Sequence, residues 1–164
     1  MERTRFRNRL AGLLLLFLIS PACSRPDTAY RFVSAQTALR DGGSYRFEVR
    51  CTDTMHLYSM TLAARVVTGR IPDQKLDVII RTESPDGEMT VEPYSLPLKE
   101  EAGVRMTLGS GSVADFEWAW QALRPHSGQE GSWQIVVTPA REEIGEAIYG
   151  FGLSYKERPW EKEN

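Results

Sequence analysis

Residues that could carry catalysis or hold a metal are few and widely spaced in this chain. The two histidines, His56 and His126, are about seventy residues apart, and neither has a second ligand at the spacing of a metal site such as His-x-His or Cys-x-x-Cys. Ser110 lies in a Gly-Ser-Gly segment, which lacks the Gly-x-Ser-x-Gly elbow of a hydrolase nucleophile and is typical of a loop. The adjacent Glu142 and Glu143 are typical of solvated surface. We therefore expect no metal site, no cofactor and no enzymatic activity.

A second set of residues could bind sugars. Trp118, Trp120 and Trp133 carry rings that could stack against sugar rings, as binding modules built on β-sandwiches do, and Tyr94 is a further aromatic candidate. Trp118 and Trp120 alternate with smaller or polar residues, however, and that pattern is typical of the interior of a sandwich. Burial in the core is therefore the favoured interpretation, and a glycan platform is the alternative.

Arginines form a third candidate group. Four of them fall on the expected solvent faces of strands, and would form a basic stripe if those strands are neighbours: Arg46, Arg50, Arg65 and Arg81. Glu48 and Asp77 lie among them, which favours a salt-bridged surface. The alternative is recognition of an acidic partner or of a glycan that bears carboxylates. The ligand-binding candidates from the sequence are Trp118, Trp120, Tyr94, Arg46 and Arg50.

The N-terminus has the pattern of an export signal. Arginine alternates with other residues over residues 1–9, and an apolar run of about ten residues fills residues 10–19. That run is too short to cross a bilayer, which needs about twenty apolar residues, and is typical of a secretory signal peptide. The small residues Ser20-Pro21-Ala22 follow, and Cys23 comes next. This segment resembles the lipobox of bacterial lipoproteins, in which the cysteine after the cleavage point is diacylated and begins the mature chain.

The resemblance implies that Cys23 is the lipid-attachment residue. Two or three acyl chains, each worth about 0.8 kcal/mol per buried methylene, would make the anchoring effectively permanent. The alternatives are an ordinary signal peptide cut after Ala22 and a disulfide between Cys23 and Cys51, which a lipid on Cys23 would exclude. Cys51 takes a buried-face position in an expected strand without a basic neighbour on that face, so we expect an inert core thiol.

Length and charge limit the possible domain organisation and partners of the chain. We expect a signal peptide over residues 1–22, a short polar tether over 23–29, one domain over 30–157 and a charged tail over 158–164. Without the signal peptide the chain holds 16 basic and 21 acidic residues, a formal charge of −5. Nucleic acid is not an expected partner, because phosphate binding needs a basic surface.

Apolar and polar residues alternate with a period of two through the domain, which is typical of strands with one buried face. The clearest case is residues 45–51, where Tyr45, Phe47, Val49 and Cys51 share a face. The other expected strands are residues 57–67, 76–82, 88–92, 104–108, 113–123, 133–138 and 149–155. A Pro-Asp-Gly turn at residues 85–87 is expected to pair 76–82 with 88–92.

Four local features refine this pattern. Pro93 and Pro97 cannot donate to a ladder, so their segment is an edge strand or a loop. Residues 113–123 favour a strand, because a helix would place its two tryptophans about 200° apart. Residues 140–147 are the one plausible helical turn. In the last strand, Tyr149, Phe151, Leu153 and Tyr155 form the expected buried face, and the glycines opposite them at 150 and 152 indicate close approach of another backbone or side chain.

Eight or so short strands, separated by Gly and Pro turns and with almost no helix, define the expected fold. We predict an all-β domain, a two-sheet antiparallel β-sandwich of Ig-like or jelly-roll type. A closed lipocalin-like barrel is the alternative.

Several features of the chain occur together in one known family. They are the lipoprotein signal ending at Cys23, the Arg50 strand leading into Tyr58-Ser59, the Pro85-Asp86-Gly87 turn, the run Gly131-Ser132-Trp133-Gln134-Ile135, and the closing strand from Ile148 to Lys156. In this respect residues 30–157 resemble the gliding-motility lipoproteins of the GldH type found in Bacteroidetes. The resemblance implies a non-enzymatic periplasmic or outer-membrane lipoprotein associated with gliding or protein-secretion machinery, and it supplies no catalytic residue.

We therefore expect a lipid-anchored cell-envelope protein whose sandwich binds other envelope proteins, as an accessory or assembly component of such machinery. The alternative is a glycan-binding lipoprotein that uses exposed aromatic and arginine side chains. Ser24 follows the lipid cysteine where enterobacterial lipoproteins carry Asp for inner-membrane retention, so the analogy favours the outer membrane. Asp27 is the single acidic residue in the segment just after Cys23, which favours the leaflet that faces the periplasm.

Overall fold

The structure is a computed structural model, which describes residues 28–109 and 111–159. The expected signal peptide, Cys23 and most of the expected tether lie outside the described residues. The strands in these ranges are β1 (Thr28–Ser34), β2 (Tyr45–Cys51), β3 (His56–Val67), β4 (Lys75–Glu83), β5 (Met89–Pro97), β6 (Val104–Leu108), β7 (Val113–Leu123), β8 (Gly131–Pro139) and β9 (Ile148–Pro159). The helices are α2 (Ala35–Arg40) and α3 (Glu142–Gly145), with the 3-10 turns η1 (Thr68–Arg70) and η2 (Pro72–Gln74).

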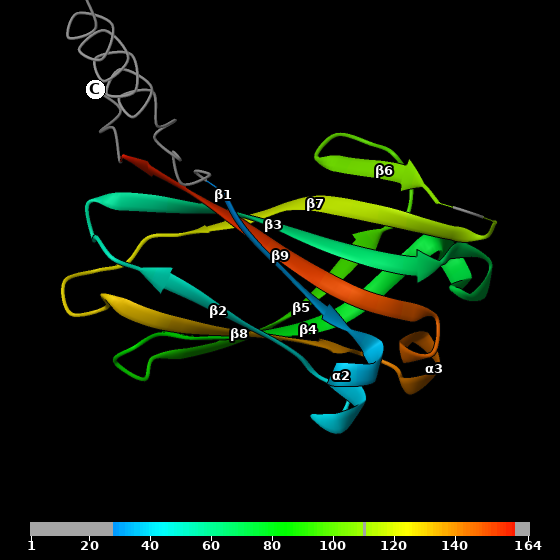
Figure 1. Cartoon of the computed structure of the whole chain (residues 1–164), viewed down its shortest axis with the longest axis horizontal. Helices are drawn as coiled ribbons and strands as arrows, with labels where there is room; N and C mark the ends of the chain where they lie inside the picture. The colour runs from blue at the N-terminus through cyan, green and yellow to red at the C-terminus, as the bar shows by residue number, and fades with distance from the viewer. Residues whose placement is uncertain (1–27, 110, 160–164) are drawn as a thin grey trace, which may run out of the picture.

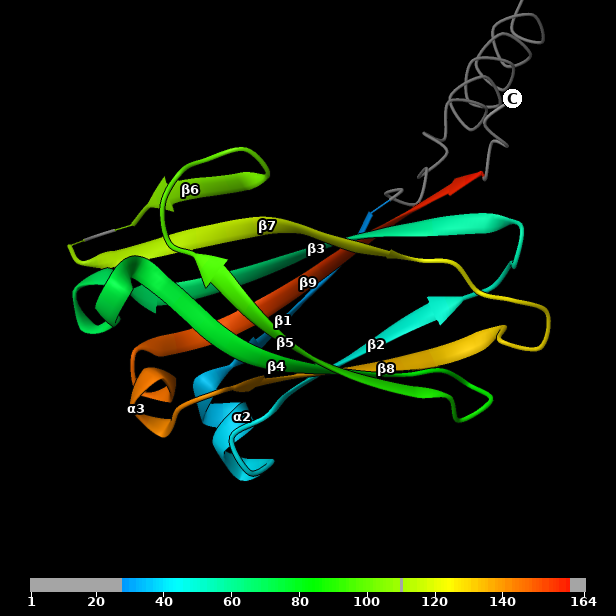
Figure 2. The ribbon, with the colours of Figure 1, turned by 180° about the vertical axis from the view of Figure 1, so that it is seen from behind.

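The strands form two layered antiparallel sheets. One sheet has five strands in the order β1-β9-β3-β7-β6, and the other has four in the order β2-β8-β4-β5. Figures 1 and 2 show the two sheets lying over one another, with α2 beside the end of β1 and α3 between β8 and β9. The expected two-sheet all-β sandwich is therefore confirmed. The described strands stay in two separate sheets, so the barrel alternative is wrong.

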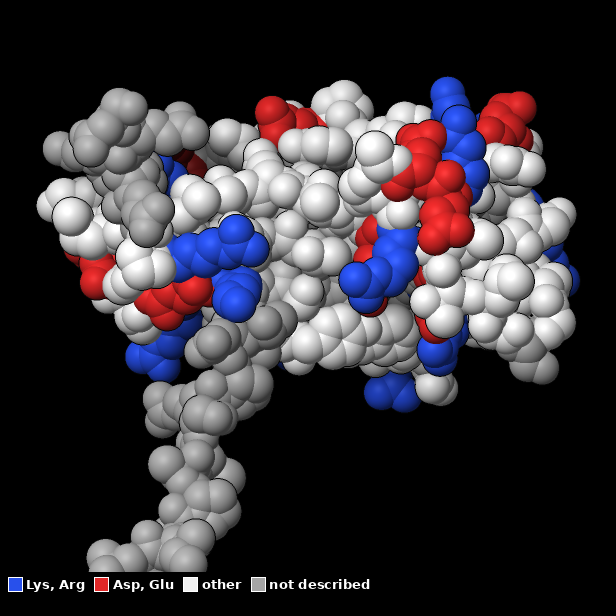
Figure 3. Space-filling view, turned by 90° about the horizontal axis from the view of Figure 1, so that it is seen from above, with Lys and Arg blue, Asp and Glu red and all other residues white. Residues whose placement is uncertain are grey.

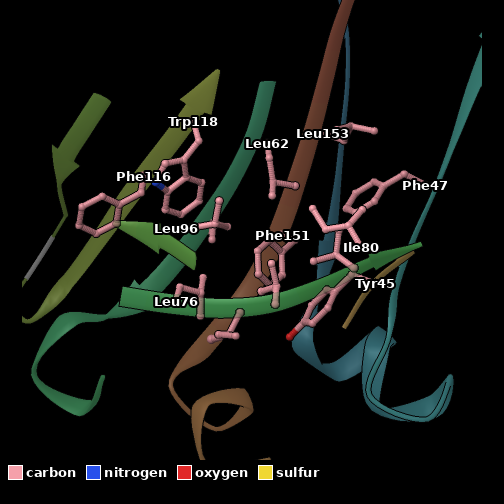
Figure 4. Close-up of a cluster of buried hydrophobic side chains, with 14 of the residues drawn as sticks. Tyr45, Phe47, Leu62, Leu76, Ile80, Leu96, Phe116, Trp118, Phe151 and Leu153 are labelled. Atoms are coloured by element: carbon pink, nitrogen blue, oxygen red, sulfur yellow. The ribbon is translucent and has the colours of Figure 1, made fainter. Parts of the chain in front are cut away.

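The side chains that fill the gap between the sheets are the ones that the alternation of apolar and polar residues predicts. β2 alternates strictly between buried and exposed residues, and the expected inward residues of β3 and β4 are buried as well. Figure 4 shows side chains of both sheets meeting in this gap, among them Phe47, Leu62, Phe116 and Phe151. All four are essentially inaccessible to solvent. Apolar burial on this scale, at roughly 25 cal/mol per Å², is the main stabilising term of the fold.

The Pro-Asp-Gly turn and the edge strand are also confirmed. β4 pairs with β5 from Lys75 opposite Pro97 to Glu83 opposite Met89, and the turn between them is closed by the Gly87 N–H, which donates to the Ser84 carbonyl at 3.0 Å. Gly87 has a φ of +87°, which glycine adopts without a steric penalty. β5, with its two prolines, is the outermost strand of its sheet. The segment 113–123 is strand β7, and α3 provides the helical turn expected within 140–147.

Residue Tyr149 departs from the expected pattern of the last strand. The pairing of β3 with β9 shifts register at the end of β3, so that Arg65 lies opposite Gly150 but Val66 lies opposite Ile148. The residue between them is left unpaired, as in a β-bulge. Tyr149 is therefore 53% exposed, while Ile148 takes the buried position. The expectation that Tyr149 lies on the buried face is wrong, although Phe151 and Leu153 are buried as expected.

Helix α2 is not indicated by the alternation, and the first and last strands extend past residues 30 and 157. α2 begins after Ser34, whose hydroxyl accepts a hydrogen bond from the Thr37 N–H at 3.3 Å, and it buries only Ala38. Six residues are fewer than two helical turns, which is too short to leave a helical period in the sequence. β1 begins at Thr28, within the expected tether, and β9 runs to Pro159, into the expected tail. The first and last strands pair with each other or with β3 there, which extends the sandwich by about two residues at each end.

Candidate functional site

Trp118 lies in the core, as the core interpretation predicts. Its side chain is 3% exposed, and its Nε1 donates a hydrogen bond to the Pro97 carbonyl at 2.8 Å. The ring also stacks on that of Phe116, with centroids 5.9 Å apart and planes 13° from parallel. This hydrogen bond runs from β7 to β5 and so links the two sheets. A ring held in this way offers no face to a sugar.

Trp120 and Tyr94 are half-buried rather than exposed. Their rings meet edge to face, with centroids 6.1 Å apart and planes at 82°. The Tyr94 hydroxyl donates to Glu92 Oε2 at 2.7 Å, and burial raises the pKa of this tyrosine. Both residues pack against the core, where they link β7 to the edge strand β5. Trp133 is also half-buried, with its Nε1 donating to the Gln129 carbonyl at 3.1 Å.

The four arginines do not form one stripe. Arg46, Arg50 and Arg81 lie on the outer face of the four-stranded sheet, whereas Arg65 lies on β3 in the other sheet. Val136 lies between Arg46 and Arg81 in the register of the strands, and it is only 6% exposed although it faces outward. Long arginine stems cover apolar surface while their charged heads stay in water, which accounts for this burial.

Apolar side chains gather beside these arginines. Three of them are exposed, Ile79 by 41%, Met89 by 56% and Val91 by 57%. Met89 and Val91 are two residues apart on β5, and Ile79 on β4 lies diagonally across from Val91, because Ile79 pairs with Pro93 and Val91 pairs with Arg81. We call Ile79, Met89 and Val91 the edge patch. It lies on the outer face of β4 and β5, at the free edge of the four-stranded sheet.

The opposite outer face, on the five-stranded sheet, holds a second candidate site. Figure 3 looks onto this face, where charged side chains gather in groups separated by uncharged surface. A hollow of about 560 Å³ is lined by Phe32, Tyr149, Val113, Gly109, Arg65 and Asp115. A second hollow of about 310 Å³ is lined by Tyr30, Ala63, Thr107 and Glu117, and shares Phe32, Arg65 and Asp115 with the first. We call the two adjoining hollows the outer groove.

The glycines of β9 explain how aromatic rings reach this groove. Gly150 and Gly152 face outward, opposite Ser34 and Phe32 of β1. A Cβ on Gly152 would lie 2.6 Å from the Tyr30 hydroxyl, and one on Gly150 would lie 2.7 Å from Phe32 Cε1. The ends of both rings therefore lie directly over glycine backbone. The close approach that the sequence indicated is confirmed, and its partners are Tyr30 and Phe32.

The polar side of the groove is a set of ion pairs across β3, β7 and β6. Arg65 donates to both carboxylate oxygens of Asp115, from Nε at 2.7 Å and from Nη2 at 2.8 Å. Arg105 lies 3.6 Å from Glu117. The hydrogen bonds from Arg65 hold the pKa of Asp115 below its usual value, whereas burial, helped by the charges of Asp115 and Glu117, raises the pKa of Tyr30. At neutral pH Asp115 is thus a carboxylate and Tyr30 a protonated phenol.

His56 belongs to a polar cluster at the end of the sandwich where β3 begins and β9 ends. Its Nδ1 lies 3.1 Å from Asp53 Oδ2 and 3.2 Å from Glu157 Oε1. The nearby Tyr58 hydroxyl accepts hydrogen bonds from the backbone N–H groups of Thr52 and Asp53. The Tyr58 hydroxyl also donates to Glu157 Oε1 at 3.1 Å, so Tyr58 links the β2–β3 loop to β9. Across residues 28–109 and 111–159, no group of His, Cys, Asp and Glu residues has an arrangement that could hold a metal ion.

Cys51 is a free thiol at the end of β2 and is inaccessible to solvent. Burial, with a smaller effect of the Glu157 charge, raises its pKa to about 12. A thiol held protonated in this way is a poor nucleophile, which fits the core role expected from the sequence.

Comparisons with known proteins add no relative to this description. No protein-family model, curated protein or solved structure matches the chain. Within the part of the chain that the structure describes, no helix has the length and apolar character needed to cross a bilayer.

Proposed function

We propose that this chain is a non-enzymatic, lipid-anchored protein of the cell envelope. Its partners bind the outer faces of its sandwich. In this proposal it serves as an accessory or assembly component of a gliding- or secretion-type machinery, as its resemblance to the GldH-type lipoproteins implies. It is attached through Cys23 to the outer membrane and faces the periplasm. The role we propose is one of binding, and the two charged residues that line the larger hollow of the outer groove, Arg65 and Asp115, are already paired with each other.

The edge patch is the observation that carries the protein-binding role. Three large apolar side chains lie exposed and adjacent at the edge of the four-stranded sheet. Clustered apolar groups rimmed by polar residues are typical of surfaces that bind proteins. Arg81 lies opposite Val91 and Glu83 lies opposite Met89 on the same outer face, and the side chains of Arg81 and Glu83 approach to 4.0 Å. A partner that combines apolar side chains with charges of both signs would complement this surface.

The position of the first strand supports the anchored arrangement. β1 begins at Thr28, five residues after Cys23, and a five-residue extended chain spans at most about 18 Å. A lipid on Cys23 would therefore hold the end of the sandwich at which β1 begins close to the membrane. Both outer faces would remain accessible to partners in the periplasm.

Photo-crosslinking in native membranes tests the binding role. We expect a photoreactive amino acid at position 91 to give an adduct of discrete mass with another envelope protein, because Val91 lies in the centre of the edge patch. The matched control is the same probe at position 39, since Leu39 is an equally apolar exposed residue on α2. An adduct at neither position, or the same adduct at both, would contradict the proposal.

Acyl labelling tests the anchor separately. Cells fed a labelled fatty acid are expected to incorporate it into the wild-type chain and into Cys51→Ala, but not into Cys23→Ala. Mass spectrometry of the N-terminal peptide should show the acyl mass on Cys23. An unmodified Cys23, or one disulfide-bonded to Cys51, would overturn lipid anchoring. The protein-binding role of the edge patch would then depend on the crosslinking result alone.

A further inference from the structure

We propose that the outer groove binds an uncharged saccharide. This site lies on the five-stranded sheet, away from the edge patch, so it is a second binding activity beyond the proposed function. The argument rests on three features of the groove: its hollow shape, the exposure of its aromatic rings, and the balance of its charges.

The groove is an open surface hollow and not an enclosed cavity. Its larger hollow, about 560 Å³, falls within the range of roughly 300–1,000 Å³ typical of sites for small molecules. The smaller hollow adjoins it across the Arg65–Asp115 pair. A ligand that extends from one hollow into the other would therefore pass over this ion pair, as a chain of linked sugar rings could.

Three aromatic rings are exposed along this groove. Tyr30 and Phe32 are 63% and 43% exposed, although the ends of their rings lie over the backbone of β9. Tyr149 is brought to the surface by the bulge in β9, where no core packing requires it. Exposed aromatic rings offer an apolar face together with a defined orientation. The C–H faces of pyranose rings are complementary to such surfaces.

The polar groups of the groove suit hydroxyls better than ions. Of the charged residues that line the groove, Arg65 is paired with Asp115, and Glu117 is paired with Arg105, which lies outside the lining on β6. A charged ligand would find one attractive and one repulsive partner in each pair. Sugar hydroxyls both donate and accept, and they can use the carboxylates as acceptors together with the guanidinium N–H groups of Arg65 that Asp115 leaves free. The Tyr30 hydroxyl adds a further donor.

The test is affinity electrophoresis of the purified full chain in native gels that contain a soluble polysaccharide. The neutral panel comprises β-glucan, α-glucan, mannan and xylan, and the anionic panel comprises alginate and polygalacturonate. We expect at least one neutral polysaccharide to retard the wild-type protein, with little dependence on salt. Tyr149→Ala should weaken this retardation by about tenfold or more, because the ring offers a stacking surface and supports no part of the core.

The control variant is Val91→Ser, which changes the edge patch and should leave retardation unchanged. Because the two sites lie on different sheets, loss of crosslinking at position 91 and loss of sugar binding can be told apart. The proposal is overturned if no neutral polysaccharide retards the protein, if only anionic ones do so at low salt, or if Tyr149→Ala binds as wild type. A peptide that binds at Tyr149 where no sugar does would overturn it as well.

Discussion

Replacing Phe151 by alanine is expected to lower the free energy of unfolding by about 3–5 kcal/mol, which is typical when a buried aromatic ring is removed. Phe151 is inaccessible to solvent, and its ring meets that of Tyr45 edge to face, with centroids 4.8 Å apart and planes at 69°. Phe151 lies on β9 and Tyr45 on β2, so this contact joins the two sheets. The loss should appear as a lower midpoint in denaturant unfolding of the purified chain, followed by circular dichroism.

Tyr149→Ala is the matched control for this prediction. It removes a ring of similar size from the same strand only two residues away, but from an exposed position created by the bulge. A surface substitution of this kind is expected to change stability by no more than about 0.5 kcal/mol. If the two variants lost comparable stability, Tyr149 would have to lie inside the sandwich, and the register shift at Val66 would be wrong.

Local alternation was sufficient to predict most of the sandwich. In β2 each apolar residue is separated by one charged residue, and burial of one face makes a slip of even one position costly. The same reasoning predicted β7, where a helix would have split Trp118 from Trp120 and a strand buries Trp118 beside Phe116. The pattern was sufficient here because the alternation of apolar and polar residues within each strand indicates which of its faces is buried.

The bulge and helix α2 could not be predicted in this way. A bulge depends on how two strands meet, and the sequence of β9 alone continues its alternation through Tyr149 without interruption. Helix α2 is so short that its serine cap is its main signal, and Ser34 also ends a strand. The bulge depends on the pairing of β9 with β3, and α2 depends on a cap from Ser34, the last residue of β1.

The candidate site shows the same limit more clearly. The sequence indicated that Gly150 and Gly152 admit a close neighbour, but the neighbours are Tyr30 and Phe32, more than a hundred residues away. Likewise Arg65 and Asp115 are fifty residues apart and meet only because β3 pairs with β7. Alternation places Arg65 with Arg46, Arg50 and Arg81, because all four fall on outward faces, but it carries no information about which sheet a strand joins.

Gly150→Ala is expected to destabilise the protein by about 1–3 kcal/mol, the cost typical of forcing an extra methyl group into a packed site. The added Cβ would lie 2.6 Å from the Val33 carbonyl oxygen as well as against the Phe32 ring. A ring can turn aside, but the carbonyl belongs to the backbone of β1, so relief requires β1 to shift relative to β9. Denaturant unfolding of the variant measures the cost.

Gly152→Ala provides the comparison, because the atoms closest to its added Cβ all belong to the Tyr30 ring. A smaller loss is expected there, and adding Tyr30→Ala to Gly152→Ala should restore much of it. Adding Phe32→Ala to Gly150→Ala should restore little, since the Val33 carbonyl remains in place. The two double-mutant cycles thus separate a side-chain contact from a backbone contact. Equal recovery in both would mean that the Phe32 ring, and not the Val33 carbonyl, opposes the added Cβ at position 150. The aromatic side chains of the outer groove would then be free to rearrange.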